Sequence, residues 1–134
     1  MLDEVILAID PGLNIGIALV HLDGSIKHRE IVTLEELRDY CLSRGEIVVV
    51  GNGTGSGKVL EILQQKGCNY TICDETNTSF EARNLYFQDF PPKGLVRFLP
   101  RGLWFPNVPI DDYAACVIAR RYLTGSCNSE KLKR

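Results

Sequence analysis

The sequence predicts an α/β fold: a mixed five-stranded sheet, with three antiparallel leading strands and then parallel ones, and helices on both faces. The first observation is that three strand-like segments at the start of the chain follow one another through short turns, which favours antiparallel pairing. The second is that helical and strand-like segments alternate afterwards, which favours parallel strands covered by helices. The length of 134 residues is typical of one domain. We expect this domain at residues 1–125, followed by a polar tail at 126–134.

The three leading strands are predicted from apolar runs and one turn signal. Residues 4–9 form an apolar run that suits a buried strand, and residues 15–22 form a second. Asp23-Gly24 is a strong hairpin turn signal. Residues 25–32 alternate in polarity, which indicates a third strand with one solvent-facing side.

The period then changes from that of a strand to that of a helix. Thr33 and Glu36 form a capping box at the start of a helical pattern, and Gly45 follows its end. Residues 46–50 are a short apolar strand that leads into a glycine-rich stretch. A second helix is expected at about 56–66 and a fifth strand at 69–73.

The last third of the chain contains two more helices separated by an irregular segment. A capping box at Thr78 and Glu81 opens a helix that ends near Phe90, before a proline pair. Residues 91–109 are proline-rich and irregular. The final helix is expected at 111–123. Basic and aromatic side chains are interleaved in the irregular segment: Lys93, Arg97, Arg101, Trp104 and Phe105.

The charge distribution is uneven along the chain. The net charge of −2 by itself argues against a nucleic-acid-binding protein. However, residues 1–90 carry fourteen acidic and seven basic side chains, whereas residues 91–134 carry three acidic and eight basic ones. Such asymmetry indicates either a surface that binds a polyanion or an uneven surface without function.

The cysteines and the hydropathy bear on the compartment. The five cysteines are odd in number and lack C-x-x-C spacing, which favours reduced thiols in a cytoplasmic protein and makes a zinc site improbable. No apolar run approaches the roughly 20 residues that span a bilayer, and no signal-peptide pattern opens the chain. We therefore expect a cytoplasmic protein without a membrane partner.

The stretch GNGTGSGKV at residues 51–59 raises the question of a nucleotide-binding loop. A phosphate loop needs G-x-x-x-x-G-K-[ST], but Asn52 stands where its first glycine belongs and Val59 replaces the Ser or Thr. The stretch is then either a flexible turn between strand and helix or a place where backbone amides contact a phosphodiester. The second interpretation makes candidates of Gly53, Thr54, Ser56 and Lys58.

Acidic residues far apart in the sequence are predicted to meet at one edge of the sheet. Asp10 ends the first strand and Glu75 follows the fifth, so parallel strands would place both at the same edge. The last helix, which begins with Asp111 and Asp112, would bring a third carboxylate beside them. Clustered carboxylates repel one another unless a divalent cation neutralises them, and hard oxygen ligands favour Mg²⁺ or Mn²⁺. The alternatives are that Asp10 is a plain turn residue and that Asp111 or Asp112 is only a helix cap.

Four motifs in order resemble the YqgF/RuvC-like resolvase family of the ribonuclease H-like superfamily. ILAIDPGLNIGIA at 6–18 is similar to that family's opening D-x-G motif, and IVVVGNGTGS at 47–56 to its fourth-strand segment. CDETNTSFEA at 73–82 resembles its D-E-x-x-T-x-x-E-A segment, and the residues at 111–123 its closing helix. The resemblance covers nearly the whole chain, and its closing motif aligns the ligand with Asp111 and leaves Asp112 as its neighbour.

The resemblance implies a ribonuclease H-like fold and a nuclease. It implies that Asp10, Glu75 and Asp111, with Asp112 as a further metal ligand, hold two Mg²⁺ or Mn²⁺ ions that activate water against a phosphodiester. YqgF-type members are linked to ribosomal RNA precursors, and RuvC-type members cut Holliday junctions as homodimers. The expected partners are therefore branched DNA or structured RNA, and a second copy of the chain.

The chain departs from the family pattern at two phosphate-contacting positions. Thr76 and Asn14 stand where the family often has arginines. The irregular segment at 91–109 is longer than in the simplest members, and its cations, Lys93, Arg97 and Arg101, would replace those contacts. Trp104 or Phe105 either stacks on an unpaired base or fills the core under a long loop.

Two other functions remain open from the sequence. One is a nucleic-acid-binding module without catalysis, as in the Tex transcription accessory proteins. The other is an ATPase related to actin and Hsp70, which share a similar opening motif but need two such domains to enclose a nucleotide.

Overall fold

The computed structural model of the protein describes residues 5–12, 14–39, 47–53, 55–76, 78–100, 103–106 and 108–127. Among the predicted site residues, Thr54 and Arg101 lie outside these ranges. Within them, none of the helices has the length and apolarity that a membrane crossing needs.

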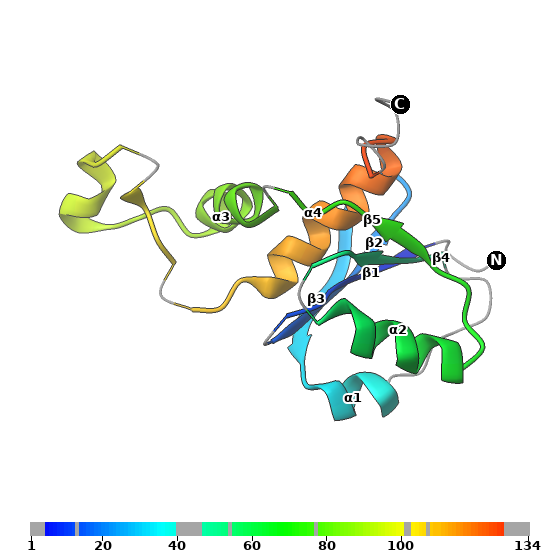
Figure 1. Ribbon diagram of the computed structural model, residues 1–134. Coiled ribbons are helices and arrows are strands. Elements are labelled where there is room, and N and C mark those ends of the chain that lie inside the picture. Colours follow the sequence, from blue (N-terminus) through cyan, green and yellow to red (C-terminus); the bar gives the residue numbers. More distant parts are fainter. Residues whose placement is uncertain are drawn as a thin grey trace.

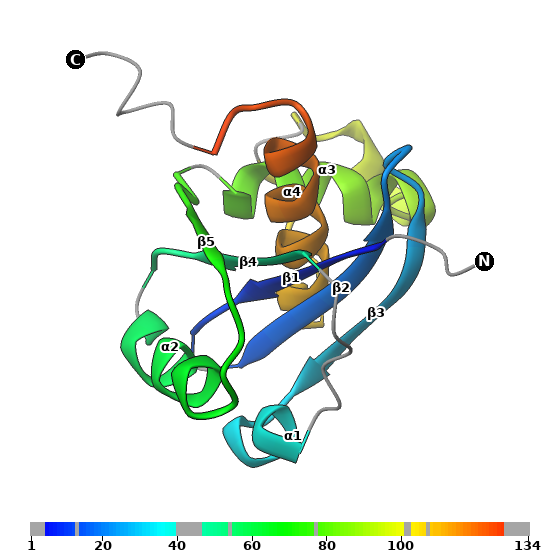
Figure 2. The same cartoon turned by 90° about the vertical axis from the view of Figure 1, so that its right-hand side faces the viewer.

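A five-stranded mixed sheet forms the centre of the molecule. Its strands are β1 (Val5–Asp10), β2 (Ile15–His21), β3 (Ile26–Val32), β4 (Ile47–Gly51) and β5 (Thr71–Cys73). They lie side by side in the order β3-β2-β1-β4-β5, as Figure 2 shows. The β1–β2 and β2–β3 pairs are antiparallel, and the β1–β4 and β4–β5 pairs are parallel. This confirms the predicted fold class.

Helices cover both faces of the sheet (Figure 1). Alternate residues of β1 explain why, since Leu7 and Ile9 join one core cluster and Ile6 and Ala8 join the other. The short α1 (Leu34–Asp39) and α2 (Ser56–Gln65) cover the first face. The second face is covered by α4 (Asp111–Leu123), and α3 (Thr78–Asp89) packs on α4 rather than on the sheet.

The closest contact between a helix and the sheet lies between α4 and β2. Small side chains line this contact, with Ala18 on the strand and Ala115 and Ala119 on the helix. At the start of the helix even a methyl group would be too large, because a Cβ on Gly16 would overlap the backbone of Asp111. The glycine thus sets the place of the first turn of α4 over the edge of the sheet.

An arm extends from the body between α3 and α4. It consists of residues 90–106, and it contains the one-turn 3₁₀ helix η1 (Gly94–Phe98). Figure 1 shows it projecting away from the sheet at the end of α3. Its hydrophobic side chains are largely exposed, among them Leu95, Phe98 and Phe105. The irregular segment predicted from its prolines is therefore an appendage of the fold rather than a plug in its core.

The prediction that all cysteines are reduced thiols is wrong for two of them. Cys73 at the end of β5 and Cys127 after α4 form a disulfide, and both are buried. The Asp74 amide donates to the Cys127 carbonyl at 2.8 Å, so the chain after α4 lies alongside the end of β5. The described chain is therefore held against the sheet as far as Cys127. The spacing of the cysteines in the sequence gives no indication of this pair, because the two thiols meet only when the chain folds back.

Candidate active site

Asp10 lies at the carboxyl end of the central strand β1 and is almost fully buried. Its exposed fraction is 7%. Burial, and to a smaller extent the nearby negative charges of Glu75 and Asp111, raise the pKa of this carboxyl from 3.8 to about 8. Asp10 and Glu75 are close enough for their carboxyl groups to share a hydrogen bond. Two of the predicted site residues therefore meet at the edge of the sheet.

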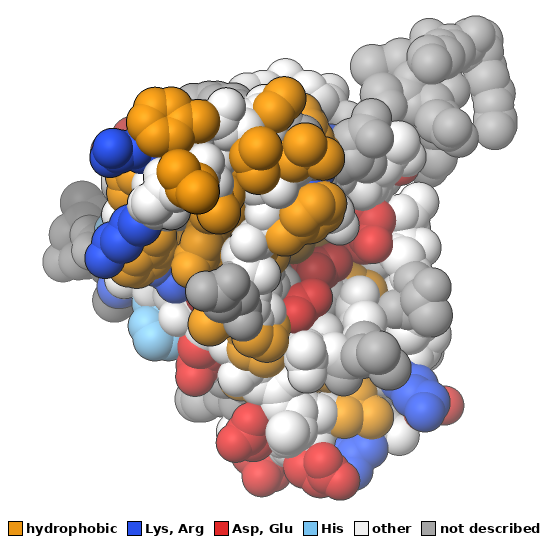
Figure 3. Space-filling model, turned by 90° about the vertical axis from the view of Figure 1, so that its left-hand side faces the viewer, with side chains coloured by type: hydrophobic (Ala, Val, Ile, Leu, Met, Phe, Trp, Pro, Cys, Tyr) orange, Lys and Arg blue, Asp and Glu red, His pale blue; other side chains and the backbone are white. Residues whose placement is uncertain are grey.

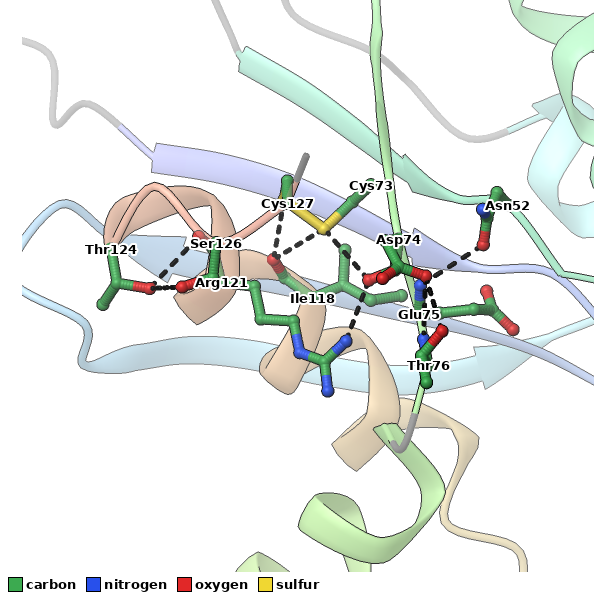
Figure 4. Close-up of a disulfide and its surroundings, with 10 residues drawn as sticks. All are labelled: Asn52, Cys73, Asp74, Glu75, Thr76, Ile118, Arg121, Thr124, Ser126 and Cys127. Atoms are coloured by element: carbon green, nitrogen blue, oxygen red, sulfur yellow. Dashed lines mark hydrogen bonds between the residues drawn. A yellow bond between two sulfur atoms is a disulfide. The ribbon is translucent and has the colours of Figure 1, made fainter. Parts of the chain in front are cut away.

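Glu75 is held in a space that two glycines leave open. A Cβ on either Gly51 or Gly53 would overlap the Glu75 carboxylate. The Glu75 amide donates to Asn52 Oδ1 at 3.2 Å, which fixes the backbone (Figure 4). Burial raises the pKa of the Glu75 carboxyl, although a hydrogen bond from the Gly53 amide opposes this. One carboxylate oxygen, Oε1, is buried and has no hydrogen-bond partner among the described residues.

Asp111 is the first residue of α4 and faces the same region. Burial raises the pKa of its carboxyl, and a hydrogen bond from the Asn14 side chain opposes the shift. From the sequence, Asn14 is only a residue that stands where the family often has an arginine. In the structure its side chain contributes a hydrogen bond to Asp111.

Asp112 is turned to a different partner. Arg29 on β3 donates to Asp112 Oδ2 at 2.8 Å and to the Tyr113 hydroxyl at 2.6 Å. Asp112 is 8% exposed, so the ion pair compensates for a nearly buried charge. Arg29 is not among the residues predicted from the sequence. The one feature that could have indicated it is a cation on a strand whose residues alternate in polarity.

The acidic side chains have the chemistry of ligands for a hard cation, but they are not grouped around one common position. Within the described residues, no three Asp, Glu, His or Cys side chains are grouped as they would be around one metal ion. Carboxylate oxygens are nevertheless the ligands that Mg²⁺ and Mn²⁺ prefer. Glu75 Oε1, which has no hydrogen-bond partner among the described residues, is an oxygen that could bind such a cation.

The glycine-rich stretch has a structural role that the sequence did not reveal. Gly53 makes space for Glu75, as described above, and Ser56 starts α2. Lys58 is exposed in the first turn of that helix. The stretch thus lies next to the acids.

The arm places two predicted cations and separates two aromatic residues. Lys93 and Arg97 are exposed on it. The Trp104 indole donates to the Leu99 carbonyl at 2.9 Å and packs edge-on against Phe87. Phe105 is 66% exposed, with the Arg83 guanidinium 4.9 Å from its ring centre. Trp104 therefore holds the arm together, whereas Phe105 faces outward.

Two arginines at the end of α4 form hydrogen bonds with other segments of the protein. Arg120 donates to the Gly24 carbonyl at 3.2 Å. Arg121 donates to the Asp74 carbonyl at 2.9 Å and pairs with Glu81 at 3.0 Å. Both side chains therefore connect the end of α4 to neighbouring segments.

Comparison with known proteins establishes the fold. No model of a known protein family matches the sequence, and neither does any curated protein sequence. Among solved structures, the chain is similar to Thermus thermophilus RuvC in complex with a Holliday junction substrate, with 19% identity, a TM-score of 0.52 and coverage of 96% of each chain. Another structure of Thermus thermophilus RuvC aligns with 18% identity, a TM-score of 0.48 and coverage of 95% and 96%. The fold is thus the RuvC-like, ribonuclease H-like fold that the sequence motifs predicted.

Proposed function

We propose that this chain, with its RuvC-like fold, is a metal-dependent endonuclease that hydrolyses phosphodiester bonds in branched DNA. The observation that carries the proposal is that the buried Asp10, at the end of β1, and the half-buried Glu75, just after β5, lie within hydrogen-bonding reach of each other and near Asp111. Like charges that are partly removed from water repel one another unless they bind something positive. A Mg²⁺ or Mn²⁺ ion bound at this edge would supply that positive charge.

The residues have distinct roles in the proposed site. Asp10, Glu75 and Asp111 would bind the cations, which would neutralise the phosphate and activate a water molecule. Gly53 keeps the Glu75 carboxylate in place, and Asn14 orients Asp111. Asp112, which we predicted as a further ligand, forms an ion pair with Arg29, and this pair supports a role in holding the first turn of α4.

The nucleic-acid contacts are proposed on both sides of the acids. Lys58 and the amides of Gly53, Thr54 and Ser56 would contact the backbone at the start of α2. Lys93, Arg97 and Arg101 would contact it along the arm. Branched DNA is favoured over precursor ribosomal RNA because the RuvC structure with the higher TM-score is a complex with a Holliday junction substrate.

The other expectations about the whole protein are proposals as well. They are a single domain at residues 1–125 and a homodimer. A cytoplasmic location also remains a proposal, and the Cys73–Cys127 disulfide removes the cysteine argument for it.

A cleavage panel tests the proposed function. The purified chain would be incubated with a four-way junction, duplex DNA, single-stranded RNA and precursor ribosomal RNA, with Mg²⁺, Mn²⁺ or EDTA. We expect metal-dependent cutting of the junction, and loss of cutting in a folded Asp10→Asn variant. Glu61→Gln, an exposed carboxylate on α2, serves as the control. Cutting by Asp10→Asn at the parental rate would refute the assignment.

A second candidate is a nucleic-acid-binding module without catalysis. It is favoured by one observation, the lack of a metal-ready group among the described acids. Under this hypothesis the chain binds the junction but neither binds Mn²⁺ nor cuts with any metal. Calorimetric titration with Mn²⁺ in the absence of DNA separates the two functions.

A further inference from the structure

A cavity of about 410 Å³ opens between the end of α3 and the arm. Its walls are mostly aromatic rings and prolines, including Tyr86, Phe87, Phe90 and Phe105. Phe90 is 54% exposed and Phe105 is 66% exposed. Tyr86 and Phe90 lie with ring centres 5.1 Å apart and their planes only 33° from parallel. The walls therefore present flat apolar faces that nothing in the described chain covers fully.

The charge around this cavity is positive. Among the described residues that line it, Lys93 is the one that carries a charge, and none is acidic. The Arg83 guanidinium lies over the Phe105 ring at the rim. Flat apolar faces bordered by cations match a polyanion that carries flat rings. The bases and phosphates of a nucleic-acid strand have this combination.

The cavity and the acidic site are connected through two packed helices. The helix α3 begins at Thr78, three positions after Glu75, and the Thr78 hydroxyl donates a hydrogen bond to the Glu75 carbonyl at 2.9 Å. At the other end of α3, Tyr86 contacts Tyr113 of α4 with ring centres 5.7 Å apart. A helix of the length of α3 is roughly 18 Å long. In Figure 3, hydrophobic side chains gather beside a recess lined with acidic side chains.

We propose that this cavity receives an unpaired base of the DNA substrate, a few nucleotides from the phosphate at the acids. The base would stack on Phe105 and Phe90, and Lys93 and Arg83 would contact the adjoining phosphates. The inference rests on the proposed function for the identity of the substrate. It adds that the chain selects DNA with unpaired bases near a branch, because a continuous duplex offers no free ring.

A binding experiment without catalysis tests the cavity. The full chain in EDTA would be titrated into a four-way junction carrying one unpaired 2-aminopurine at the branch, and into a fully paired duplex with the same label. We expect the fluorescence of the unpaired label to be quenched on binding, since stacking quenches it. We expect Phe105→Ala and Phe90→Ala each to weaken junction binding on the order of tenfold and to remove the quenching, without changing duplex binding.

The arm offers a matched control in Phe98→Ala. Phe98 is 72% exposed and does not line the cavity. Equal losses in Phe105→Ala and Phe98→Ala, equal losses on junction and duplex, or unchanged quenching would each overturn the proposal. Preferential binding of the corresponding RNA or of an acidic peptide would also overturn it. Circular dichroism confirms that each variant is folded.

The outcomes separate this inference from the proposed function. Quenching that depends on Phe105, in a chain that cuts nothing with any metal, would support the cavity and refute the nuclease. Metal-dependent cutting that is indifferent to Phe105 and Phe90 would support the nuclease and refute the cavity.

Discussion

Arg29 and Asp112 form an ion pair 2.8 Å long that fastens the middle of β3 to the first turn of α4. The same guanidinium lies 4.0 Å from the centre of the Tyr113 ring, and the Tyr113 hydroxyl donates to Asp89 at 2.9 Å. The residue next to a proposed metal ligand is thus held by a network that includes the end of α3. The network fixes the helix from which Asp111 projects.

Removing Arg29 should destabilise the protein and disturb the site. Arg29→Ala leaves the Asp112 charge nearly buried and unpaired, so we expect a loss of about 2–4 kcal/mol in the free energy of unfolding. Arg29→Lys should recover only part of it, because an ammonium lacks the planar fork that contacts both partners. Urea denaturation measures these differences. Lys27→Ala, on the exposed part of the same strand, is the control, and an equal effect there would contradict the prediction.

Gly53→Ala should impair the site while sparing the fold. The three atoms nearest to the added methyl all belong to the carboxylate of Glu75, a flexible group that can move aside. We therefore expect little change in stability but a fall in cleavage of roughly 10–100-fold, as for residues that orient metal ligands. Gly57→Ala changes the same stretch at a position with open space. Equal activities of the two variants would show that Gly53 does not hold Glu75.

The parts of the structure that could be predicted depend on short-range patterns. The Asp23-Gly24 turn and the apolar runs predict the hairpin-linked strands, and strand ends predict where Asp10 and Glu75 meet. These inferences need only the geometry of a sheet. The glycine-rich stretch departs from the phosphate-loop motif at two positions, and in the structure its Gly53 leaves room for the Glu75 carboxylate.

The remaining contacts depend on how distant segments pack. Arg29 contacts Asp112 only because α4 packs across β2 and β3, which brings its first turn next to the middle of β3. Cys73 meets Cys127 only because the chain turns back after α4. Trp104 and Phe105 are adjacent in sequence, but Trp104 is half-buried and Phe105 is exposed, a difference that no periodicity indicates in an irregular arm. In each case the deciding information is a tertiary register that the local sequence does not contain.

The pKa of Asp10 makes the stability of the metal-free chain depend on pH. Its folded-state value of about 8 lies above the ordinary value of 3.8, so between these limits the folded chain binds a proton that the unfolded chain has released. Stability contributed by this group therefore falls as pH rises from about 4 to about 8. Water reaching the site weakens the effect, and we expect a loss of about 1–3 kcal/mol between pH 5 and pH 8.

Thermal denaturation in EDTA checks this dependence. The decline should be much smaller in Asp10→Asn, which has no carboxyl to ionise. Adding Mn²⁺ at pH 8 should raise the melting temperature of the parent but not that of the variant. A parent and a variant with the same pH profile would show that Asp10 is not the group responsible.

The disulfide should stabilise the fold and support the site at once. Cys73 and Cys127 are separated by 54 positions in the sequence, and closing a loop of this size is expected to contribute about 2–4 kcal/mol. Because Cys73 precedes Asp74 and Glu75 directly, the bond also fastens the end of β5 to the segment after α4, as Figure 4 shows. Cys127→Ser should therefore lower both the melting temperature and the affinity for Mn²⁺. Dithiothreitol should lower the melting temperature of the parent and leave that of Cys127→Ser unchanged. If the reductant shifts both proteins equally, or neither, the stabilising role assigned to this bond is wrong.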